Sequence, residues 1–453
     1  MNMKKLSLLL LLLIAMLTSC SDTDKADKLR LELKYDEAAA LYQKAADNGD
    51  AYAMWRLAEC YSNGNGIEFN QKKAYDWIVK SAKAGQEEAK VDLALTKIDG
   101  LYGQPKNVKE GIKEMEVLYS SSNNAYTYLK YAGLFWDGVQ GEIEKDRSKA
   151  VEIINKLEDK NSPYYNWFMG IVYCTGTDDI DIDENKAIEF WNKSFSEGFY
   201  GSLQIANLYA NGGSQIEKNI DKAIEFYKKG VETNGTGSML HLANLYLSPD
   251  SSLQKYHNPK AALELLKKAV KHGGADACDR LGCMYAFGEN VEKDDEQAVK
   301  YFKLADEYGS SNGTLNLGAN YHTGRGVEQD LKKAEACYKK AADRGNHEAA
   351  MRIAECYANH TFGYDLTKYK EYLNKAVKLG SPRATYKMAE LYYHGYSELN
   401  IKQDVFQAFV YAKKAADAGW IDACEMVSYL YENGIGCDKD IAKAKEYHNK
   451  ASM

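Results

Sequence analysis

Residue types that often carry out catalysis or hold metals occur in this sequence, but not at the spacings that such chemistry needs. His347 is followed by Glu348, as in zinc-binding helices, yet residue 351 is methionine, so the second histidine ligand is missing. No Cys-x-x-Cys pair is available for zinc. No glycine-rich turn ends in the Gly-Lys-Ser/Thr of a phosphate loop. We therefore predict no catalytic residue, no metal site and no cofactor.

The side chain with the clearest chemical role is the thiol of Cys20. Lys4 and Lys5 precede an apolar stretch over residues 6–17, which is too short to cross a bilayer core that needs about 20 residues. This is the layout of a secretory signal peptide, predicted here for residues 1–19. The segment Leu17-Thr18-Ser19-Cys20 resembles the bacterial lipobox. The resemblance implies cleavage before Cys20 and acylation of that residue, and two acyl chains anchor a protein stably. The alternatives are a plain signal peptide and an uncleaved anchor.

The residues after Cys20 bear on location. Ser21 stands where an aspartate would resemble the inner-membrane retention signal of some bacteria, so its presence favours the outer membrane. Residues 21–24 (Ser-Asp-Thr-Asp) resemble acidic signals of surface lipoproteins, although a solvated tether explains them equally well. We expect a short acidic tether over residues 20–29 and an outer-membrane lipoprotein of the bacterial cell envelope, with surface exposure as a further hypothesis.

The rest of the chain is an internal repeat. Segments that end in alanine and glycine recur: Gly49 is followed by Gly85 after 36 residues, and Gly273 by Gly309 and Gly345 at the same interval. Asn161 and Asn234 stand at two expected glycine positions, and asparagine also tolerates a left-handed helix end.

Further markers recur in phase with these glycines. Predicted N-cap residues begin the second helix of each repeat: Asn70, Asn107, Asp146, Asp183, Asn219, Asn258, Asp294, Asp330, Asp365, Asp404 and Asp440. An aromatic residue such as Tyr61, Tyr285 or Tyr392 stands near the end of the first helix, three residues before a turn glycine. Apolar residues follow three-to-four spacing with no alternation of period two. The sequence therefore predicts an all-α protein of helix–turn–helix repeats.

The combination of Gly-x-Gly turns, Asp/Asn-x-x-Lys-Ala and Lys-Ala-Ala-x-x-Gly resembles the Sel-like repeat family of the tetratricopeptide superfamily. Good copies of the turn are Gly64-Asn65-Gly66 and Gly324-Arg325-Gly326. The resemblance implies a right-handed α-α superhelix, or solenoid, of about eleven repeats, in which stacking supplies the core. We predict an N-terminal capping helix over residues 30–49 and the Sel-like repeat solenoid over residues 50–453.

Eight cysteines remain besides Cys20. Cys60 and Cys356 share a repeat position that elsewhere holds Leu, Val or Met, so we interpret them as small core residues. Cys278 with Cys283, and Cys337 with Cys356, could lie close together, and whether either pair is bonded stays open.

The composition constrains the partners. A net charge of −7 gives no basic surface for a phosphate backbone, so we expect no nucleic acid. The resemblance implies a scaffold that binds other proteins or peptides along its concave face, attached to the membrane through the Cys20 lipid, and no enzyme.

Aromatic residues outside the repeat phase are the candidate contacts, because Tyr and Trp contribute much interface energy. They are Trp55, Trp136, Tyr164, Tyr165, Trp167, Tyr200, Tyr393 and Trp420. The in-phase tyrosines are expected to be spacers of the stack. The alternative function is a glycan-binding or hydrolytic envelope lipoprotein, in which these aromatics stack on sugar rings.

Overall fold

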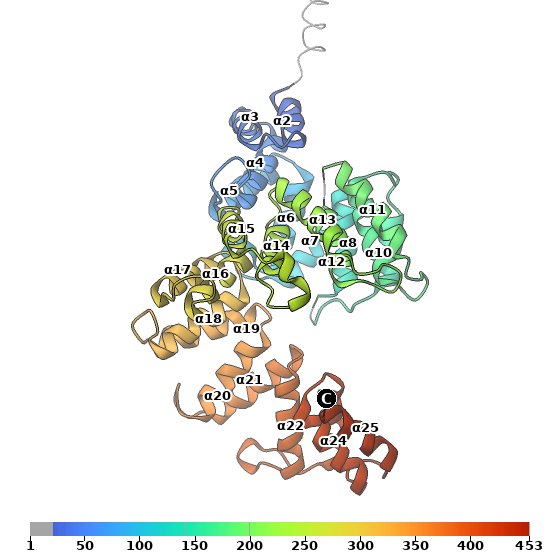
Figure 1. The fold of residues 1–453 in the computed structure, drawn as a ribbon. Helices are drawn as coiled ribbons and strands as arrows, with labels where there is room; N and C mark the ends of the chain where they lie inside the picture. Colours follow the sequence, from blue (N-terminus) through green and yellow to red (C-terminus); the bar gives the residue numbers. More distant parts are fainter. Residues whose placement is uncertain (1–20, 140, 199, 453) are drawn as a thin grey trace, which may run out of the picture. The chain divides into compact units, whose positions relative to one another are not determined.

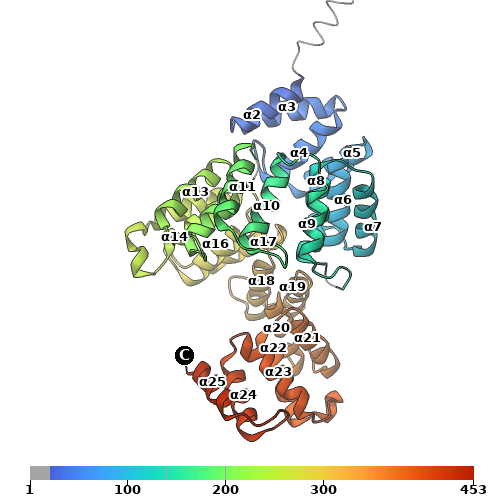
Figure 2. The same cartoon turned by 90° about the vertical axis from the view of Figure 1, so that its right-hand side faces the viewer.

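The structure, a computed structural model, describes residues 21–139, 141–198 and 200–452. The chain divides into two compact units, one up to Ala277 and one from Cys278 onwards. Both are built from antiparallel helix pairs (Figures 1 and 2). The described ranges contain no β-strand, and their β-bridges are the two isolated pairs Val139 with Ile143 and Tyr396 with Ile401. The predicted all-α solenoid is confirmed.

In the first unit, helices with even numbers are the first (A) helix of a pair and odd-numbered helices the second (B). Their bounds are α2 (Asp22–Leu31), α3 (Tyr35–Asp47), α4 (Ala51–Asn63), α5 (Gln71–Lys83), α6 (Glu87–Asp99), α7 (Val108–Ser120), α8 (Ala125–Asp137), α9 (Arg147–Asn155), α10 (Pro163–Thr175), α11 (Glu184–Ser196), α12 (Ser202–Asn211), α13 (Ile220–Glu232), α14 (Thr236–Leu247) and α15 (Pro259–Lys271). Short 3-10 helices η1 (Leu101–Gly103) and η2 (Ser251–Tyr256) lie in the α6–α7 and α14–α15 turns.

The second unit continues the same pairing after α16, which runs across the boundary. The bounds are α16 (Ala275–Phe287), α17 (Asp295–Glu307), α18 (Ser311–Thr323), α19 (Leu331–Asp343), α20 (His347–Ala358), α21 (Leu366–Lys378), α22 (Pro382–His394), η3 (Ser397–Leu399), α23 (Val405–Asp417), α24 (Ile421–Asn433) and α25 (Ile441–Ala451). Eleven A helices, α4 to α24, agree with the predicted repeat number.

The predicted N-caps explain where the B helices begin. The Asp330 carboxylate, for example, accepts the backbone N–H of Lys333 at 2.9 Å and satisfies one amide of the first turn. The same bond forms at every predicted cap except Asn107, whose side-chain amide donates to Glu110. At the left-handed ends, Asn234 has the expected positive φ of 57°, whereas the prediction for Asn161 was wrong because α9 already ends at Asn155.

Small residues in the A helices let the B helices approach closely. A methyl group added at Gly318 would lie 2.7 Å from the ring of Tyr338, and one at Gly170 would lie 2.3 Å from Trp191. The in-phase tyrosines stack on rings of the B helix, as Tyr285 does on Tyr301 with centroids 5.6 Å apart. These contacts form the inner layer of each repeat and support the interpretation of the in-phase tyrosines as spacers.

The Gly-x-Gly turn holds successive repeats together. At Gly326, where φ is +69°, a Cβ atom would lie 2.0 Å from the carbonyl oxygen of Asp295 at the start of the preceding B helix. Gly436 has the same relation to Val405. Only glycine allows the turn to approach that backbone so closely, so the second glycine of the motif is a stacking contact.

The tether prediction was wrong for residues 22–29. They belong to α2, which packs on α3 and buries Thr23 and Ala26. Ser21 begins this helix with a capping box, in which the Ser21 hydroxyl accepts from the Asp24 amide and the Asp24 carboxylate accepts from the Ser21 amide. The first pair is therefore a helical hairpin, and the capping prediction of a single helix was incomplete.

The first unit closes on itself between its first and sixth repeats. The Asn234 side-chain amide donates to the Asn65 oxygen at 3.2 Å, and the His272 Nδ1 lies 3.1 Å from the carbonyl oxygen of Asn63. A methyl group at Gly64 would lie 2.7 Å from the Lys271 carbonyl oxygen. The ends of α4 and α15 are thus neighbours in space although about 200 residues apart (Figure 1).

Candidate functional site

Four tyrosines occupy one repeat position of the first unit. Each stands twelve residues before the turn glycine of its repeat: Tyr52 before Gly64, Tyr126 before Gly138, Tyr164 before Gly176 and Tyr200 before Gly212. Three of them are the second residue of an A helix, and Tyr200 lies two residues before the start of α12. The second repeat has Glu88 at this position. Because the repeats stack in register, these side chains point to the same side of the unit.

That side contains a cavity of about 230 Å³. The α2–α3 hairpin reaches across this cavity, because the Leu31 side chain lies against Gly198. The turn after α4, which contacts the end of the sixth repeat, also borders the cavity. The lining is Arg30, Leu31, Leu33, Tyr35, Ala38, Tyr42, Arg56, Glu59, Cys60, Asn63, Asn65, Tyr126, Lys130, Tyr164, Gly198, Tyr200 and Thr233. Five tyrosines and three cations therefore face one enclosed space.

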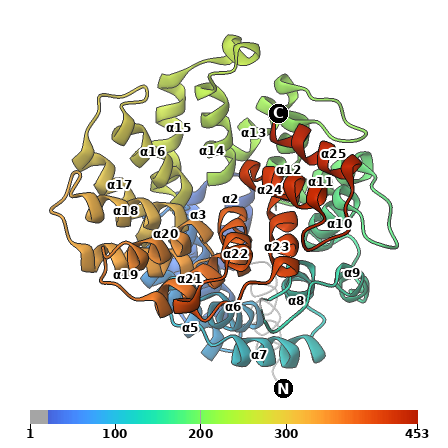
Figure 3. The ribbon, with the colours of Figure 1, turned by 90° about the horizontal axis from the view of Figure 1, so that it is seen from below.

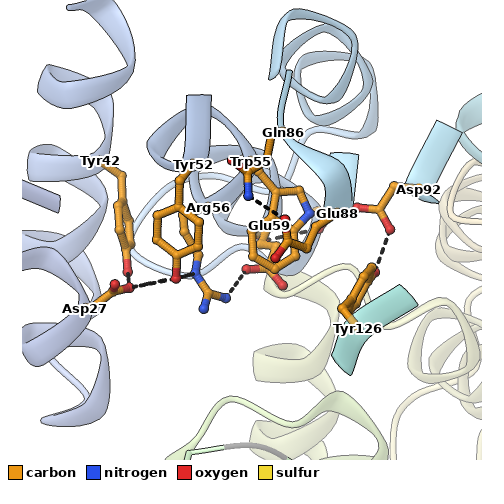
Figure 4. Close-up of polar contacts among 11 residues, drawn as sticks. Asp27, Tyr42, Tyr52, Trp55, Arg56, Glu59, Gln86, Glu88, Asp92 and Tyr126 are labelled. Carbon is orange, nitrogen blue, oxygen red and sulfur yellow. Dashed lines mark hydrogen bonds and ion pairs between the residues drawn. The ribbon is translucent and has the colours of Figure 1, made fainter. Parts of the chain in front are cut away.

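Arg56 organises one wall of this cavity (Figure 4). Its guanidinium donates to the Tyr52 hydroxyl and to the Glu59 carboxylate, each at 2.6 Å, and lies 3.7 Å from Asp27. The Asp27 carboxylate also accepts the Tyr42 hydroxyl. Burial acts to lower the pKa of the Arg56 guanidinium, but the neighbouring Glu59 carboxylate raises it more. The pKa therefore lies well above its ordinary value and Arg56 is charged.

Asp92 on α6 ties three repeats together behind the cavity. One oxygen accepts the Trp55 indole N–H at 2.8 Å and the other accepts the Tyr126 hydroxyl at 2.5 Å (Figure 4). Burial raises the pKa of this carboxyl to about 6, although both hydrogen bonds act to lower it. Trp55 and Tyr126 also meet edge to face, with centroids 5.6 Å apart. The network holds Tyr126 in its orientation toward the cavity.

Tyr200 differs from the other tyrosines in its exposure. Its side chain is 62% exposed, yet burial under the surrounding protein raises the pKa of its hydroxyl. Both observations fit a ring that lines the cavity and stays accessible from it. The charge of Glu59 also raises the pKa of the Tyr200 hydroxyl, whereas the charge of Arg30 lowers it. All three residues line the same cavity.

The structure brings only part of the predicted aromatic set to this site. Tyr164 and Tyr200 line the cavity. Trp55 and Trp136 were wrong as direct contacts, because they are only 1% and 7% exposed and belong to the core. Trp55 acts instead through its bond to Asp92.

The remaining candidates lie elsewhere and stay predictions. Tyr165 and Trp167 on α10 are half-buried in the core of the fourth repeat, where the Tyr165 hydroxyl donates to Asn155 at 3.1 Å. Tyr393 and Trp420 belong to the second unit and pack partly into its last hydrophobic cluster. The lipidation site, Cys20, lies outside the described residues.

Several cavity residues were missed from the sequence. Tyr126, which lines the cavity, and Tyr52, which is bonded to Arg56, would have been found by aligning the repeats on the turn glycine rather than on the in-phase aromatic residue. Arg56 and Lys130 share a position four residues further along the A helix, so the same alignment identifies them. Arg30 could not be found in this way because it lies on α2, outside the repeat pattern.

Two larger hollows lie elsewhere in the first unit. One of 1150 Å³ follows the turns at residues 142–149 and 175–182, and one of 880 Å³ follows α5, α6 and α7. Both are more open than the smaller cavity, and neither contains the tyrosine series. We therefore place the candidate site in the 230 Å³ cavity.

The described residues offer little for catalysis or metals. No group of three His, Cys, Asp or Glu residues among them is arranged to hold a metal ion. All eight described cysteines are free, and burial raises the pKa of the Cys60 thiol to about 12. Cys60 and Cys356 are core residues, as predicted. Among the described helices, none has the length and apolar character needed to cross a membrane.

The fold defines a helical-repeat protein. The Sel1 repeat pattern matches ten segments of the chain, residues 32–50, 51–86, 125–157, 163–199, 201–232, 237–274, 275–305, 311–346, 382–420 and 421–453. The chain therefore belongs to the Sel1 repeat family. Sel1 repeats typically form non-catalytic scaffolds for protein–protein interaction.

Similar proteins include a bacterial and a fungal example. The Sel1-repeat-containing protein YjcO of Escherichia coli is 26% identical over 168 residues, which cover 35% of this chain and 69% of YjcO. The chitin synthase regulator SKT5 of Saccharomyces cerevisiae is 25% identical over 172 residues, 37% of this chain. The match spans only a quarter of the length of SKT5.

Solved structures of similar fold include a Sel1 repeat protein from Oxalobacter formigenes. It is 24% identical, with 67% of this chain and 86% of that chain covered and a TM-score of 0.45. The protective antigen c5321 of uropathogenic Escherichia coli is 22% identical, with 91% and 86% covered and a TM-score of 0.43.

Proposed function

We propose that this protein is a lipid-anchored scaffold of the bacterial cell envelope that binds protein partners at the tyrosine-lined side of its first unit. The observation that carries the proposal is the tyrosine series at one repeat position, of which Tyr126, Tyr164 and Tyr200 line an enclosed cavity. Packing within the repeats does not need these rings, because the second unit has Asn312, Glu348, Arg383 and Asp422 at the same position. Tyrosine combines large contact area with a polar hydroxyl, which suits a binding surface.

Anchoring is the second part of the proposal. It is supported by the lipobox-like residues 17–20 and by the short distance in sequence from Cys20 to the cap of α2 at Ser21. A lipid on Cys20 would hold the α2–α3 hairpin near the membrane surface. The outer membrane remains the expected location because Ser21, rather than aspartate, follows the cysteine.

Binding is tested by photo-crosslinking in cells. A benzophenone amino acid at position 164 or 200 should capture the same identified partner protein, whereas position 76, exposed on α5, should not. Capture of that partner equally from all three positions would contradict binding in the cavity. If glycan and no protein co-purifies with the full-length lipidated chain, the protein is instead a glycan-binding lipoprotein and the scaffold proposal fails.

Anchoring is tested separately with Cys20→Ser. This change should abolish incorporation of radioactive palmitate and move the protein from the membrane fraction to the soluble fraction. A variant that is still labelled would contradict lipidation at Cys20. Proteolysis of intact cells then distinguishes the outer surface from the periplasmic face.

A further inference from the structure

The charges on the cavity wall are unbalanced. Arg30, Arg56 and Lys130 line it, and Glu59 is the single carboxylate among its lining residues. Glu59 is already paired with Arg56. Asp27 and Asp92 are not among the lining residues. One oxygen of Asp27 accepts the Tyr42 and Tyr52 hydroxyls, and the two oxygens of Asp92 accept the Trp55 indole N–H and the Tyr126 hydroxyl. The cavity therefore presents positive charge to whatever enters it.

Two of the three cations have no carboxylate partner within ion-pair distance among the described residues. The Arg30 Nε is buried and accepted by no hydrogen-bond partner. The Lys130 ammonium lies over the Tyr126 ring, 5.1 Å from its centroid, and acts on the carboxylates of Asp92 and Asp99 only at longer range. Both side chains line the cavity, so an anion that enters it would meet two cationic groups without a close carboxylate.

The remaining wall is aromatic and apolar. Tyr126 and Tyr164 meet edge to face with centroids 5.6 Å apart, and Tyr200, Leu31 and Leu33 also line the cavity. A volume of 230 Å³ holds about seven waters or one group the size of an amino-acid residue. An apolar body fits against these rings, and its anionic end would face the cations.

We propose that the cavity binds a carboxylate attached to an apolar or aromatic body of residue size, with Arg30 and Lys130 as its charge partners. A guanidinium pairs with a carboxylate through parallel hydrogen bonds, and the neighbouring ammonium adds a second charge-assisted contact. The cavity belongs to the tyrosine-lined side of the first unit, so this ligand chemistry rests on the proposed function. The carboxylate belongs either to a partner chain or to a free small molecule.

The test uses purified chain and a pair of probes that differ in charge alone. N-acetylphenylalanine should bind in calorimetric titration, and N-acetylphenylalaninamide should bind at least about tenfold more weakly. Equal affinity for the acid and the amide, or no binding of the acid at millimolar concentration, would overturn the proposal. Because no partner protein is needed, failure here leaves the crosslinking test of the scaffold intact.

Matched variants locate the site. Arg30→Gln and Lys130→Gln should each weaken binding of the acid by about tenfold and leave the amide unaffected. Lys80→Gln is the control, because Lys80 also lies over an aromatic ring, 3.9 Å from the Trp77 centroid, but outside the cavity. Circular dichroism confirms that each variant is folded. Wild-type affinity in both cavity variants would contradict the assignment.

A peptide ending in a phenylalanine carboxylate separates the two sources. Tighter binding of an eight-residue peptide than of N-acetylphenylalanine would assign the carboxylate to a partner chain. Equal or weaker binding of the peptide would assign it to a free small molecule. An amidated peptide that binds as well as the acid would contradict the role of the carboxylate.

Discussion

The indole N–H of Trp55 donates to a carboxyl oxygen of Asp92 at 2.8 Å and so joins the first repeat to the second. Trp55 is core by its burial, yet this bond connects it to the wall of the cavity through the Tyr126 hydroxyl. Burial raises the Asp92 pKa to about 6 from an ordinary 3.8. A change in protonation here would alter stability as well as the electrostatics behind the cavity.

The first prediction concerns this shift. Because the pKa of Asp92 is higher in the folded state than in the unfolded state, protonation of this carboxyl favours folding. The resulting stabilisation is fully present below about pH 4 and is lost as the pH rises through about 6. The side chain of Asp92→Asn is neutral at every pH, so this variant does not lose that stabilisation. Its unfolding free energy minus that of the wild type should therefore rise by about 1–3 kcal/mol between pH 4 and 7.5. Urea unfolding at both pH values measures it. Asp76→Asn, at an exposed position on α5, should show no such trend, and an identical trend in both variants would refute the assignment.

The second prediction concerns Glu184, a buried carboxylate whose pKa is shifted in the opposite direction to that of Asp92. It accepts the backbone N–H groups of Ser214 and Gln215, each at 2.7 Å, and of Ile216 at 2.8 Å. Burial acts to raise its pKa, but the three backbone donors outweigh it and the pKa is lowered. Its contribution to stability is therefore present above the ordinary pKa of 4.5 and lost as the pH falls below that value.

Glu184→Gln should destabilise the first unit by about 2–4 kcal/mol at pH 7, because an amide cannot accept from all these donors. The difference from wild type should shrink in acid. Glu189→Gln, exposed on the same helix, is the control and should change stability by less than about 0.5 kcal/mol. Equal effects of the two substitutions in chemical denaturation would contradict the role of Glu184.

The third prediction tests the stacking contact of the Gly-x-Gly turn. Gly326→Ala places a methyl group against the Asp295 carbonyl and should cost about 2–4 kcal/mol in the second unit. Gly345→Ala provides the comparison, since Gly345 also has positive φ but no atom within 4 Å of the added carbon. It should cost only about 1 kcal/mol. Thermal unfolding followed by circular dichroism distinguishes them, and equal losses would show that backbone strain alone explains the glycine.

The fourth prediction tests closure of the first unit. Gly64→Ala should push α4 away from the Lys271 carbonyl and raise amide hydrogen exchange at residues 268–274. Gly324→Ala is the matched change at the same repeat position, where the nearest atom belongs to the neighbouring Gln329 side chain. It should leave exchange at residues 268–274 unchanged. Unaltered exchange in Gly64→Ala would show that this contact contributes nothing to closure.

The fold was predictable because each repeat carries its own local signals. The caps at residues such as Asp330 and the close-packing glycines such as Gly318 act within about 36 residues, so a single sequence is enough to read them. Helix α2 was missed because its buried residues are small, and Ser21 and Asp24 were interpreted as a sorting signal rather than a capping box.

The site was less predictable than the fold. The bond between Trp55 and Asp92 joins neighbouring repeats, and the meeting of Asn65 with Asn234 depends on a rotation that accumulates over five repeats. No local pattern encodes that sum. The position of Arg30 follows from it as well, because the α2–α3 hairpin reaches the turn at Gly198 only when the curvature is right.

Closure also restricts how this protein can evolve. An open solenoid gains or loses whole repeats readily, because each repeat contacts only its neighbours. Between Asn65 and Asn234 the number of repeats is fixed by geometry, since one duplication would carry Asn234 and His272 past their partners and open the cavity. Related lineages that keep the cavity should therefore keep the repeat count of this segment constant, and duplications and deletions should fall outside it.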